Sequence, residues 1–463
     1  MSRLDLPDKA KVHMIGIGGV GVSGLAQIMS EMGYKVTGSD LCPGETAEKL
    51  KKIGVEVFAG HNSAYISGAD LVVASAAVPE DNPELVAAHE QGILVLSRAE
   101  MLGRLMSGKY GIAVAGTHGK TTTTSMIAVM LEAAELDPTV SIGGDVEQLS
   151  GNAKLGESQF FLAEACEAFN SFLELKPKMA IVTNIEADHL DCHGSLDGVI
   201  KSFKKFLSQI EQNGCAIMCL DCPNVKRVIP SVECRVITYG TGREADCSAY
   251  RLDVSVQNPS FEVVYKNRDL GKFTLNVPGI HNVRNALAVI AVGCELGIDR
   301  ETICSALLEF RGAGRRFEIL GTAQGVTVVD DYAHHPTEVA ATLAAARTWG
   351  RRVVAVFQPH LYSRTQLFAD GFADSLKEAD LVVLTEIYAA REKPIPGVSA
   401  KMISDRMEAG KARFLPDKQQ LAEELAPLLK EGDLVVVMGA GDIRSSAEEL
   451  LTRLEADAGT ERN

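Results

Sequence analysis

Residues 111–124 read Gly-Ile-Ala-Val-Ala-Gly-Thr-His-Gly-Lys-Thr-Thr-Thr-Thr, an apolar run that leads into a glycine-rich turn and a threonine-rich segment. The apolar run predicts a buried strand, and the segment after Lys120 predicts a helix. Glycines let backbone N–H groups face phosphates, and a helix N-terminus adds positive potential. Lys120 can reach β- and γ-phosphate oxygens, and the Thr121 hydroxyl can bind Mg²⁺. This stretch therefore predicts a phosphate-binding loop.

The stretch departs from the general phosphate-loop motif in one respect. The motif has four residues between its first glycine and Gly-Lys, whereas only Thr117 and His118 separate Gly116 from Gly119. A glycine-rich turn that binds no ligand is the alternative interpretation. The strand and helix expected on either side favour the phosphate loop.

The segments around this loop alternate short apolar runs with helical stretches, which predicts βαβ units and parallel sheets. We expect strands at residues 12–17, 35–37, 55–58, 71–74 and 94–96, and helices at 23–32 and 46–53. Beyond the loop we expect strands at 160–163 and 179–183, added antiparallel strands between about 235 and 277, where the apolar period approaches 2, and a helix at 285–296. A third set of strands is expected at 326–329, 353–357, 381–385 and 434–438.

The predicted fold is α/β with three domains. Residues 1–108 would form a Rossmann-like domain, residues 109–318 a central P-loop ATPase-type domain with a parallel sheet plus added antiparallel strands, and residues 319–463 a second Rossmann-like domain. The length of 463 residues agrees with about three domains at roughly 150 residues each.

Composition limits the classes of partner. The net charge of -15 opposes non-specific binding to nucleic acid or to anionic lipid. The first residues lack the basic and apolar segments of a signal peptide, and no apolar run approaches the ~18 residues that span a bilayer. We therefore expect a cytoplasmic protein with no membrane insertion and no nucleic-acid partner. The ten cysteines then predict buried thiols, with zinc binding near Cys215–Cys222 the minor alternative.

A second glycine pattern lies near the N-terminus. Gly16-x-Gly18-x-x-Gly21 follows a predicted strand and precedes a predicted helix, and Asp40 ends the next strand. This arrangement matches the dinucleotide-binding fingerprint and alone would indicate NAD. Any diphosphate placed on a helix N-terminus needs the same glycines, so a nucleotide-sugar diphosphate fits equally well.

Acids and histidines gather at predicted strand ends beyond the phosphate loop. Glu164 and Glu167 follow the strand at 160–163, where a nucleotide-bound Mg²⁺ needs a carboxylate. The strand at 179–183 ends in a second cluster, made of Glu186, Asp188, His189 and Asp191. Solvated acidic loops are the alternative for both. Further clusters occur at residues 279–286, 311–318, 330–338 and 358–365.

In their order along the chain, these motifs resemble those of the Mur ligase family. The motifs are Gly116-Thr-His-Gly-Lys-Thr-Thr, Thr183-Asn-Ile-Glu-Ala-Asp-His, Gly279-Ile-His-Asn-x-x-Asn-Ala, Gly314-Arg-Arg-Phe-Glu and Asp330-Asp-Tyr-Ala-His-His-Pro-Thr-Glu. The resemblance runs from about residue 12 to Met438-Gly-Ala-Gly-Asp-Ile. Within the family, the segments at 13–24 and 331–338 are similar to those of members that join L-alanine to UDP-N-acetylmuramate.

The resemblance implies an ATP-dependent amide-bond ligase of peptidoglycan precursor synthesis that acts through an acyl phosphate. UDP-N-acetylmuramate and L-alanine would be the substrates, ATP and two Mg²⁺ ions the cofactors, and the chain a monomer or weak homodimer. The ATP contacts implied are Gly116, Thr117, His118, Gly119, Lys120, Thr121, Thr122, His281, Asn282, Arg316 and Asp331. The substrate contacts implied are Gly16, Gly18, Gly19, Gly21, Ser39, Asp40, Ser75, Tyr332 and His360.

The resemblance also implies individual roles. Thr121 and Glu167 would bind one Mg²⁺, and His189 would bind a second. The expected catalytic set is Lys120, Glu167, His189, His334 and Arg364, and His334 is the residue expected to take the amine proton. Tyr332, His334, His360 and Arg364 would surround L-alanine.

Three positions depart from the family pattern. Cys166 and Phe169 stand where many members have acids, and Leu361 stands where members often have arginine.

The nearest alternative functions are a sister ligase that adds a preformed peptide to the same UDP-sugar and a folylpolyglutamate synthase. A nicotinamide-dependent oxidoreductase would use Gly16 to Asp40 but leaves Gly-Lys-Thr unexplained, and a non-catalytic nucleotide-binding protein leaves Lys120, Glu167 and His189 unexplained.

Overall fold

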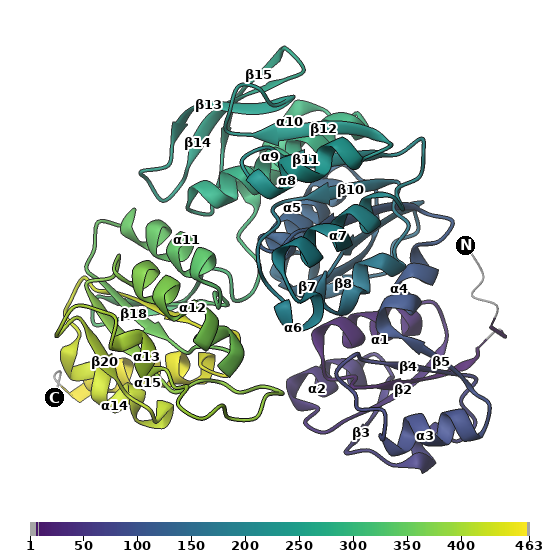
Figure 1. The fold of residues 1–463 in the computed structure, drawn as a ribbon, viewed down its shortest axis with the longest axis horizontal. Helices are drawn as coiled ribbons and strands as arrows, with labels where there is room; N and C mark the ends of the chain where they lie inside the picture. The colour runs from purple at the N-terminus through teal and green to yellow at the C-terminus, as the bar shows by residue number, and fades with distance from the viewer. Residues whose placement is uncertain (1–5, 8, 461–463) are drawn as a thin grey trace. The chain divides into compact units, whose positions relative to one another are not determined.

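The computed structural model describes residues 6–7 and 9–460 of the chain, and within them the strands form three sheets (Figure 1). The chain divides into two compact units. The first unit comprises the chain up to Leu252, together with Phe261–Thr274 and Val283–Arg311. The second unit comprises Asp253–Ser260, Leu275–Asn282 and the chain from Gly312 onward. Across the described residues, no helix is both long and apolar enough to cross a bilayer.

The first sheet has five parallel strands in the order β3-β2-β1-β4-β5. Its strands are β1 (Lys11–Ile15), β2 (Lys35–Asp40), β3 (Glu56–Ala59), β4 (Leu71–Ala74) and β5 (Leu94–Ser97). The accompanying helices are α1 (Val20–Glu31), α2 (Gly44–Lys52), the 3-10 helix η1 (Ser63–Ile66), α3 (Pro83–Glu90) and α4 (Arg98–Met106). The predicted Rossmann-like arrangement is confirmed. Strand β1 ends at Ile15, before the predicted Ile17, where Gly16 takes a φ of +79°.

The central sheet has ten strands in the order β15-β14-β13-β12-β11-β10-β6-β9-β7-β8. They are β6 (Tyr110–Ala115), β7 (Thr139–Val146), β8 (Gly151–Lys154), β9 (Phe160–Glu164), β10 (Met179–Val182), β11 (Cys215–Cys219), β12 (Arg235–Gly240), β13 (Cys247–Asp253), β14 (Ser260–Tyr265) and β15 (Arg268–Thr274). Its helices are α5 (Lys120–Ala133), η3 (Ala168–Glu174), α6 (Leu190–His193), α7 (Leu196–Leu207), α8 (Pro223–Val228), α9 (Ile280–Leu296) and α10 (Arg300–Glu309).

One prediction for this sheet is wrong. Strand β12 was expected to be antiparallel, but it pairs in parallel with β11, and Tyr239 of β12 also pairs in parallel with Cys247 of β13. The physical reason is the crossover between β11 and β12: a parallel neighbour needs one, and the chain between them forms the short helix α8. The antiparallel pair β7–β8 had no counterpart in the sequence prediction.

The third sheet lies in the second unit and has the order β16-β17-β21-β18-β19-β20. Its strands are β16 (Glu318–Ala323), β17 (Val326–Asp331), β18 (Val353–Phe357), β19 (Leu381–Leu384), β20 (Ala412–Phe414) and β21 (Leu434–Met438). Its helices are α11 (Pro336–Arg347), α12 (Tyr362–Leu376), α13 (Lys401–Ser404), α14 (Leu421–Leu425) and α15 (Arg444–Thr460). The sheet is parallel as predicted, apart from the antiparallel edge strand β16.

The first and central sheets share one hydrophobic core within the first unit. Leu25 of α1, Ala153 of β8 and Phe172 of η3 belong to the same buried cluster. The Asn152 side-chain amide also donates to Val20 O over 2.7 Å, so β8 is tied to the beginning of α1. The boundary expected near residue 108 therefore separates two sheets that pack as one unit.

Candidate active site

The phosphate loop has the backbone that its glycines permit. Strand β6 ends at Ala115 and α5 begins at Lys120. Gly116 has a φ of +140°, and a Cβ on it would lie 1.9 Å from Thr183 Oγ1. Gly119 has a φ of +78°, and a Cβ there would lie 2.8 Å from Asn285 Oδ1. Both positions therefore need glycine for conformation and for space.

The segment after β10 fixes the shape of this loop. His118 O accepts hydrogen bonds from Thr183 Oγ1 over 2.6 Å and from Asn184 Nδ2 over 3.0 Å. Asn184 Oδ1 accepts from His118 N over 2.8 Å, and Thr117 Oγ1 accepts from Glu186 N over 2.8 Å. Sequence reasoning treated this segment as a source of metal ligands and missed its contacts with the phosphate loop.

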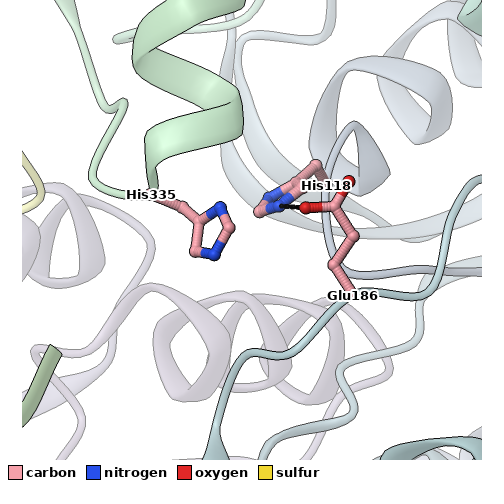
Figure 2. Close-up of side chains that lie close together, drawn as sticks. All are labelled: His118, Glu186 and His335. Carbon is pink, nitrogen blue, oxygen red and sulfur yellow. Dashed lines mark ion pairs between the residues drawn. The ribbon is translucent and has the colours of Figure 1, made fainter. Parts of the chain in front are cut away.

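His118 and Glu186 face each other at this point. His118 Nε2 lies 3.4 Å from Glu186 Oε2, as the dashed line in Figure 2 marks. The imidazole side chain is 11% exposed and the carboxylate 31% exposed. The pair becomes a salt bridge when the imidazole is protonated, so it adds a titratable contact beside the loop.

Lys120 and Glu167 form the most buried ion pair of this site. Lys120 Nζ lies 2.9 Å from Glu167 Oε2 and donates to Gly116 O over 2.6 Å and to Thr117 O over 2.9 Å. The side chains are 12% and 2% exposed. Burial alone would lower the pKa of Lys120, but the negative charge of Glu167 outweighs it and raises that pKa above the usual value. Lys120 is therefore fully charged.

The expected metal ligands lie on adjoining elements. Thr121 is in the first turn of α5, immediately after Lys120, and is buried. His189 immediately precedes α6 and has a left-handed backbone with a φ of +51°. The backbone N–H of His189 donates to Asp188 Oδ1 over 2.8 Å. The ring Nε2 of His193, in α6, lies 3.1 Å from Glu167 O. Hydroxyl and carboxylate oxygens are suitable ligands for Mg²⁺, and the buried Glu167 carboxylate carries a charge that a cation can balance. The imidazole of His189 is a nitrogen ligand, which Mg²⁺ uses less often than oxygen. The side chain of Asp191 lies outside the described part of the structure.

The N-terminal glycine loop is closed by Asp40. Gly18 N donates to Asp40 Oδ2 and Cys42 N donates to Asp40 Oδ1, each over 2.9 Å. Gly19 precedes the first residue of α1, and a Cβ on Gly16 would lie 3.1 Å from Ser75 Cβ. The structure thus brings Gly16, Gly18, Gly19, Asp40 and Ser75 together at the carboxyl edge of the first sheet.

Gly21 and Ser39 have different surroundings. A Cβ on Gly21 would lie 2.9 Å from Arg98 Cδ, so this glycine leaves room for an arginine that the sequence analysis did not select. Ser39 is fully buried, and its hydroxyl donates to Glu84 Oε2 over 2.6 Å. Glu84 is itself buried and lies 3.1 Å from His13 Nε2. Hydrogen bonds from His13, Ser39 and the backbone outweigh burial and lower the pKa of Glu84.

A small pocket lies between the beginning of α4 and η3. It has a volume of about 120 Å³. The residues that line it are Ala76, Ser97, Arg98, Ala99, Phe169, Asn170, Ser171 and Glu174. Phe169 and Asn170 both have left-handed backbones, with φ of +54° and +57°, and Phe169 is 48% exposed. The departure at Phe169 therefore places an aromatic side chain at the pocket wall.

In the second unit the predicted amino-acid residues form one cluster. The rings of Tyr332 and His334 lie 5.3 Å apart, and those of His334 and His360 lie 5.8 Å apart. Arg364 NH1 lies 3.1 Å from His360 Nδ1. Tyr388, which the sequence analysis missed, stacks on His360 at 5.8 Å. Neither its spacing nor its neighbours in sequence gave a signal for it.

Leu361 has a strained backbone beside this cluster. Its φ is +70°, it is buried, and its N–H donates to Tyr388 O over 3.0 Å. A leucine adds no charge at a position where members of the resembled family often have arginine. Arg364 therefore supplies the positive charge beside His360.

Arginines and aspartates surround the end of β17. Asp331 accepts hydrogen bonds from Phe317 N and Ala333 N over 2.8 and 2.7 Å. Burial raises the pKa of Asp331 to about 6, against the opposing effect of Arg316. Arg316 lies over the Tyr332 ring at 5.1 Å. Arg316 and Asp331, expected at the nucleotide, thus lie beside Tyr332, expected at the amino acid.

His281 and Asn282 are in the first turn of α9, which begins five residues earlier than predicted. Asn282 is buried, and its side-chain amide donates to Pro278 O over 2.7 Å. Gly279, just before the helix, has a φ of +96°. The amide of Asn282 therefore closes the turn that starts the helix.

Comparison with known proteins gives the family. The model of the Mur ligase family, catalytic domain, matches residues 11–110, that of the Mur ligase middle domain matches residues 114–293, and that of the Mur ligase, glutamate ligase domain, matches residues 315–441. The UDP-N-acetylmuramate–L-alanine ligases of Geotalea daltonii and Geobacter sp. strain M21 are 46% and 47% identical to this chain, over 96% of it and 98% of each relative.

Solved structures agree with this result. UDP-N-acetylmuramate-alanine ligase MurC from Thermotoga maritima is 31% identical and superimposes with a TM-score of 0.84, covering 96% of this chain and 99% of that one. The murein peptide ligase mpl from Psychrobacter arcticus is 27% identical, with a TM-score of 0.72 over the same shares. Matches of this extent cover all three sheets and both glycine loops, and this chain therefore belongs to the Mur ligase family.

Proposed function

We propose that this chain joins L-alanine to the lactyl carboxylate of UDP-N-acetylmuramate, with ATP converted to ADP and phosphate. The observation that carries the proposal is the buried Lys120–Glu167 pair at the phosphate loop, in a chain 46–47% identical to relatives that bear the name of this activity. The tyrosine, histidine and arginine cluster of the second unit supplies groups suited to an amino acid.

The reaction needs the carboxylate to be activated. A carboxylate does not condense with an amine in water, because hydroxide is a poor leaving group. An oxygen of the lactyl carboxylate attacks the γ-phosphorus of ATP, the bond to the bridging oxygen breaks, and ADP leaves. The L-alanine amine then attacks the acyl carbon, phosphate departs, and the nitrogen loses a proton. Positioning and charge neutralisation supply most of the acceleration in such a transfer.

The residues of the central sheet would bind ATP. Lys120 would neutralise the β- and γ-phosphate oxygens, and the N–H groups of residues 116–122 would surround them. Thr121 and Glu167 would hold one Mg²⁺ and His189 a second, and these ions would offset the negative charge of the phosphates and the carboxylate. Nucleotide contacts of four residues of the second unit, His281, Asn282, Arg316 and Asp331, stay a prediction from the family resemblance.

The other substrates would use the remaining clusters. The loop of Gly16, Gly18, Gly19 and Gly21 would take the diphosphate of UDP-N-acetylmuramate on the N-terminus of α1. Arg364 would bind the carboxylate of L-alanine, with Tyr332, His334 and His360 around it. His334 stays the residue predicted to take the proton from the amine. A cytoplasmic location and a monomeric or weakly dimeric state also stay predictions.

The test is phosphate release from MgATP in the presence of UDP-N-acetylmuramate. The acceptors to compare are L-alanine, glycine, L-serine, D-alanine and a short peptide that begins with L-alanine. Release with L-alanine that is lost in Lys120→Ala is expected. Release only with the peptide would instead assign the chain to the sister activity, and release with none would overturn the proposal. The higher TM-score of the L-alanine ligase from Thermotoga maritima supports the first outcome.

A further inference from the structure

The carboxyl ends of five neighbouring strands of the central sheet lie level with one another. Ala115 of β6 pairs with Val182 of β10, Val182 pairs with Met218 of β11, and Cys219 pairs with Tyr239 of β12. On the other side of β6, Val114 pairs with Glu164 of β9. The residues just beyond these strands therefore share one edge, with the phosphate loop following β6.

Beyond β11, this edge carries an ion pair that the proposed mechanism does not use. Arg284 Nε donates to Asp221 Oδ2 over 2.8 Å. Asp221 Oδ2 also accepts from Thr241 Oγ1 over 2.9 Å, and Asp221 Oδ1 accepts from Thr241 N over 3.0 Å. The Arg284 side chain is 42% exposed, whereas that of Asp221 is 14% exposed. The Asp221 carboxylate is thus held in place by its hydrogen bonds to Thr241, and the more exposed Arg284 side chain is the one that can contact a ligand.

Helix α9 connects this pair to the phosphate loop. Asn285, the residue after Arg284, lies against Gly119: a Cβ on that glycine would be 2.8 Å from Asn285 Oδ1. One turn of α9 therefore contacts the phosphate loop through Asn285 and the end of β11 through Arg284. Strand β11 is two positions from β6 in the sheet, about 10 Å at the usual strand spacing. An extended nucleoside triphosphate can span this distance.

Acidic residues follow the strands on both sides of the phosphate loop. Toward β9 the edge carries Glu164 and Glu167. Toward β11 it carries Glu186 and Asp188, which follow β10, and then the Asp221–Arg284 pair. Of these groups Arg284 is the exposed cation, so a base that extends toward β11 can contact a guanidinium.

We propose that Arg284, held in place by Asp221, stacks on the purine base of the bound nucleotide. This inference rests on the nucleotide site of the proposed function. A guanidinium is planar and is favourable against the face of an aromatic ring, and the hydrogen bond at Nε fixes the plane of the group. The contact is made by the face of the base, so it does not distinguish adenine from guanine. Asp221 acts as a positioning residue.

The test is calorimetric binding of MgADP, and separately of inorganic tripolyphosphate, to the full chain. Arg284→Ala should weaken ADP binding about tenfold, the loss of one cation–π contact of ordinary strength, and leave tripolyphosphate unchanged. Asp221→Asn should weaken ADP binding less, because the guanidinium remains but loses its anchor. Arg235→Ala is the matched control. Arg235 pairs with Glu295 and is 55% exposed, but it begins β12 at the opposite edge of the same sheet.

Steady-state kinetics give the second readout. In Arg284→Ala, KM for ATP should rise about tenfold while kcat stays within about twofold, since the base takes no part in the chemistry. The proposal is overturned if Arg284→Ala binds ADP as the unchanged chain does, or if it loses tripolyphosphate to the same extent as ADP. ADP binding needs neither UDP-sugar nor amino acid. A chain that fails to ligate but shows the Arg284 effect would therefore refute only the proposed function, and the reverse result would refute only this inference.

Discussion

Lys120 Nζ lies 2.9 Å from Glu167 Oε2, and this ion pair joins the first turn of α5 to the segment that follows β9. Lys120, which is expected to bind the phosphates, and Glu167, which is expected to bind a metal ion, are therefore ion-paired with each other in this structure. Lys120 additionally donates to two carbonyl groups of the loop, Gly116 O and Thr117 O. Removing either charge should consequently change stability as well as activity.

The first prediction separates these two effects. Lys120→Met should lower the free energy of unfolding by about 3–5 kcal/mol, because Glu167 would stay buried without its partner. The double variant Lys120→Met/Glu167→Gln should recover most of that loss, since no buried charge is left unpaired. Phosphate release should be lost in both variants, by about 10³-fold or more. Chemical denaturation and the phosphate assay measure the two quantities.

A surface lysine provides the control for this pair. Lys154 forms ion pairs with Glu132 and Asp137, but all three side chains are about one-third exposed or more. Lys154→Met should therefore cost less than about 1 kcal/mol and leave activity intact. If the double variant is no more stable than Lys120→Met, burial of an unpaired carboxylate is not the cause.

The second prediction concerns the close approach of Gly116 to Thr183. Gly116→Ala should destabilise the chain and abolish nucleotide binding, because its Cβ would lie 1.9 Å from Thr183 Oγ1. Adding Thr183→Ala should relieve the collision but only part of the destabilisation. The φ of +140° at residue 116 stays unfavourable for alanine, and the hydrogen bond to His118 O is lost. Full recovery in the double variant would show that the backbone conformation is unimportant; thermal unfolding and ADP binding report the result.

Much of this architecture could be predicted from the sequence because the buried strands are short apolar runs bounded by glycine or acids. Residues 71–74 were predicted as a strand and form β4 without change. The phosphate loop was found for the same reason, since its glycines and Lys120 lie within one short segment. The parallel pairing of β12 was missed because an apolar period near 2 reveals an extended chain but not the direction of its neighbour.

Contacts between distant parts of the chain were the other limit. Glu84 and His13 are buried together, yet 71 residues separate them and no local pattern marks either. The sequence pattern places Thr183 and Asn184 in a metal-binding segment, whereas their side chains donate hydrogen bonds to His118 O. Such roles depend on which strands become neighbours in the sheet, and the sequence alone does not specify that.

The third prediction tests the amino-acid cluster. Arg364→Lys should raise KM for L-alanine by about tenfold or more, because lysine keeps the charge but loses the two-pronged contact with a carboxylate. KM for ATP should change little. Arg406→Ala is the control in the same unit, since Arg406 pairs with Asp370 on an exposed face. Equal rises in both KM values would contradict the assignment of Arg364 to L-alanine; phosphate release against L-alanine concentration distinguishes the two cases.

The fourth prediction uses the left-handed backbone of Phe169. Phe169→Gly and Phe169→Ala remove the same ring from the pocket wall, but only alanine keeps the steric cost of a φ of +54°. The glycine variant should therefore be the more stable by about 1 kcal/mol, the reverse of the usual order for these residues. Both should raise KM for UDP-N-acetylmuramate alike if the ring contacts that substrate. Urea denaturation decides the first point, and a more stable alanine variant would count against the strained backbone.

The fifth prediction concerns the pH dependence of stability in the second unit. The pKa of Asp331 is raised from 3.8 to about 6, chiefly by burial. The folded chain thus holds this proton more tightly than the unfolded chain does. The contribution of Asp331 is most favourable at low pH, and it declines as the pH rises from about 4 to about 6. A shift of this size corresponds to about 3 kcal/mol.

Asp331→Asn removes this titration, and a nearby tryptophan can report it. Phe317 N donates to Asp331 Oδ2, and the Phe317 ring lies 6.2 Å from that of Trp349, the single tryptophan of the chain. Urea unfolding followed by tryptophan fluorescence at pH 4.5 and pH 7 therefore monitors the region around Asp331. The unfolding free energy of the unchanged chain minus that of Asp331→Asn should fall by about 2 kcal/mol between these pH values. Asp330, whose pKa is also raised by burial, is present in both proteins and cancels in the difference. If the difference stays constant with pH, Asp331 is ionised across the whole range. In that case the hydrogen bonds from Phe317 N and Ala333 N outweigh the effect of burial on the pKa of Asp331.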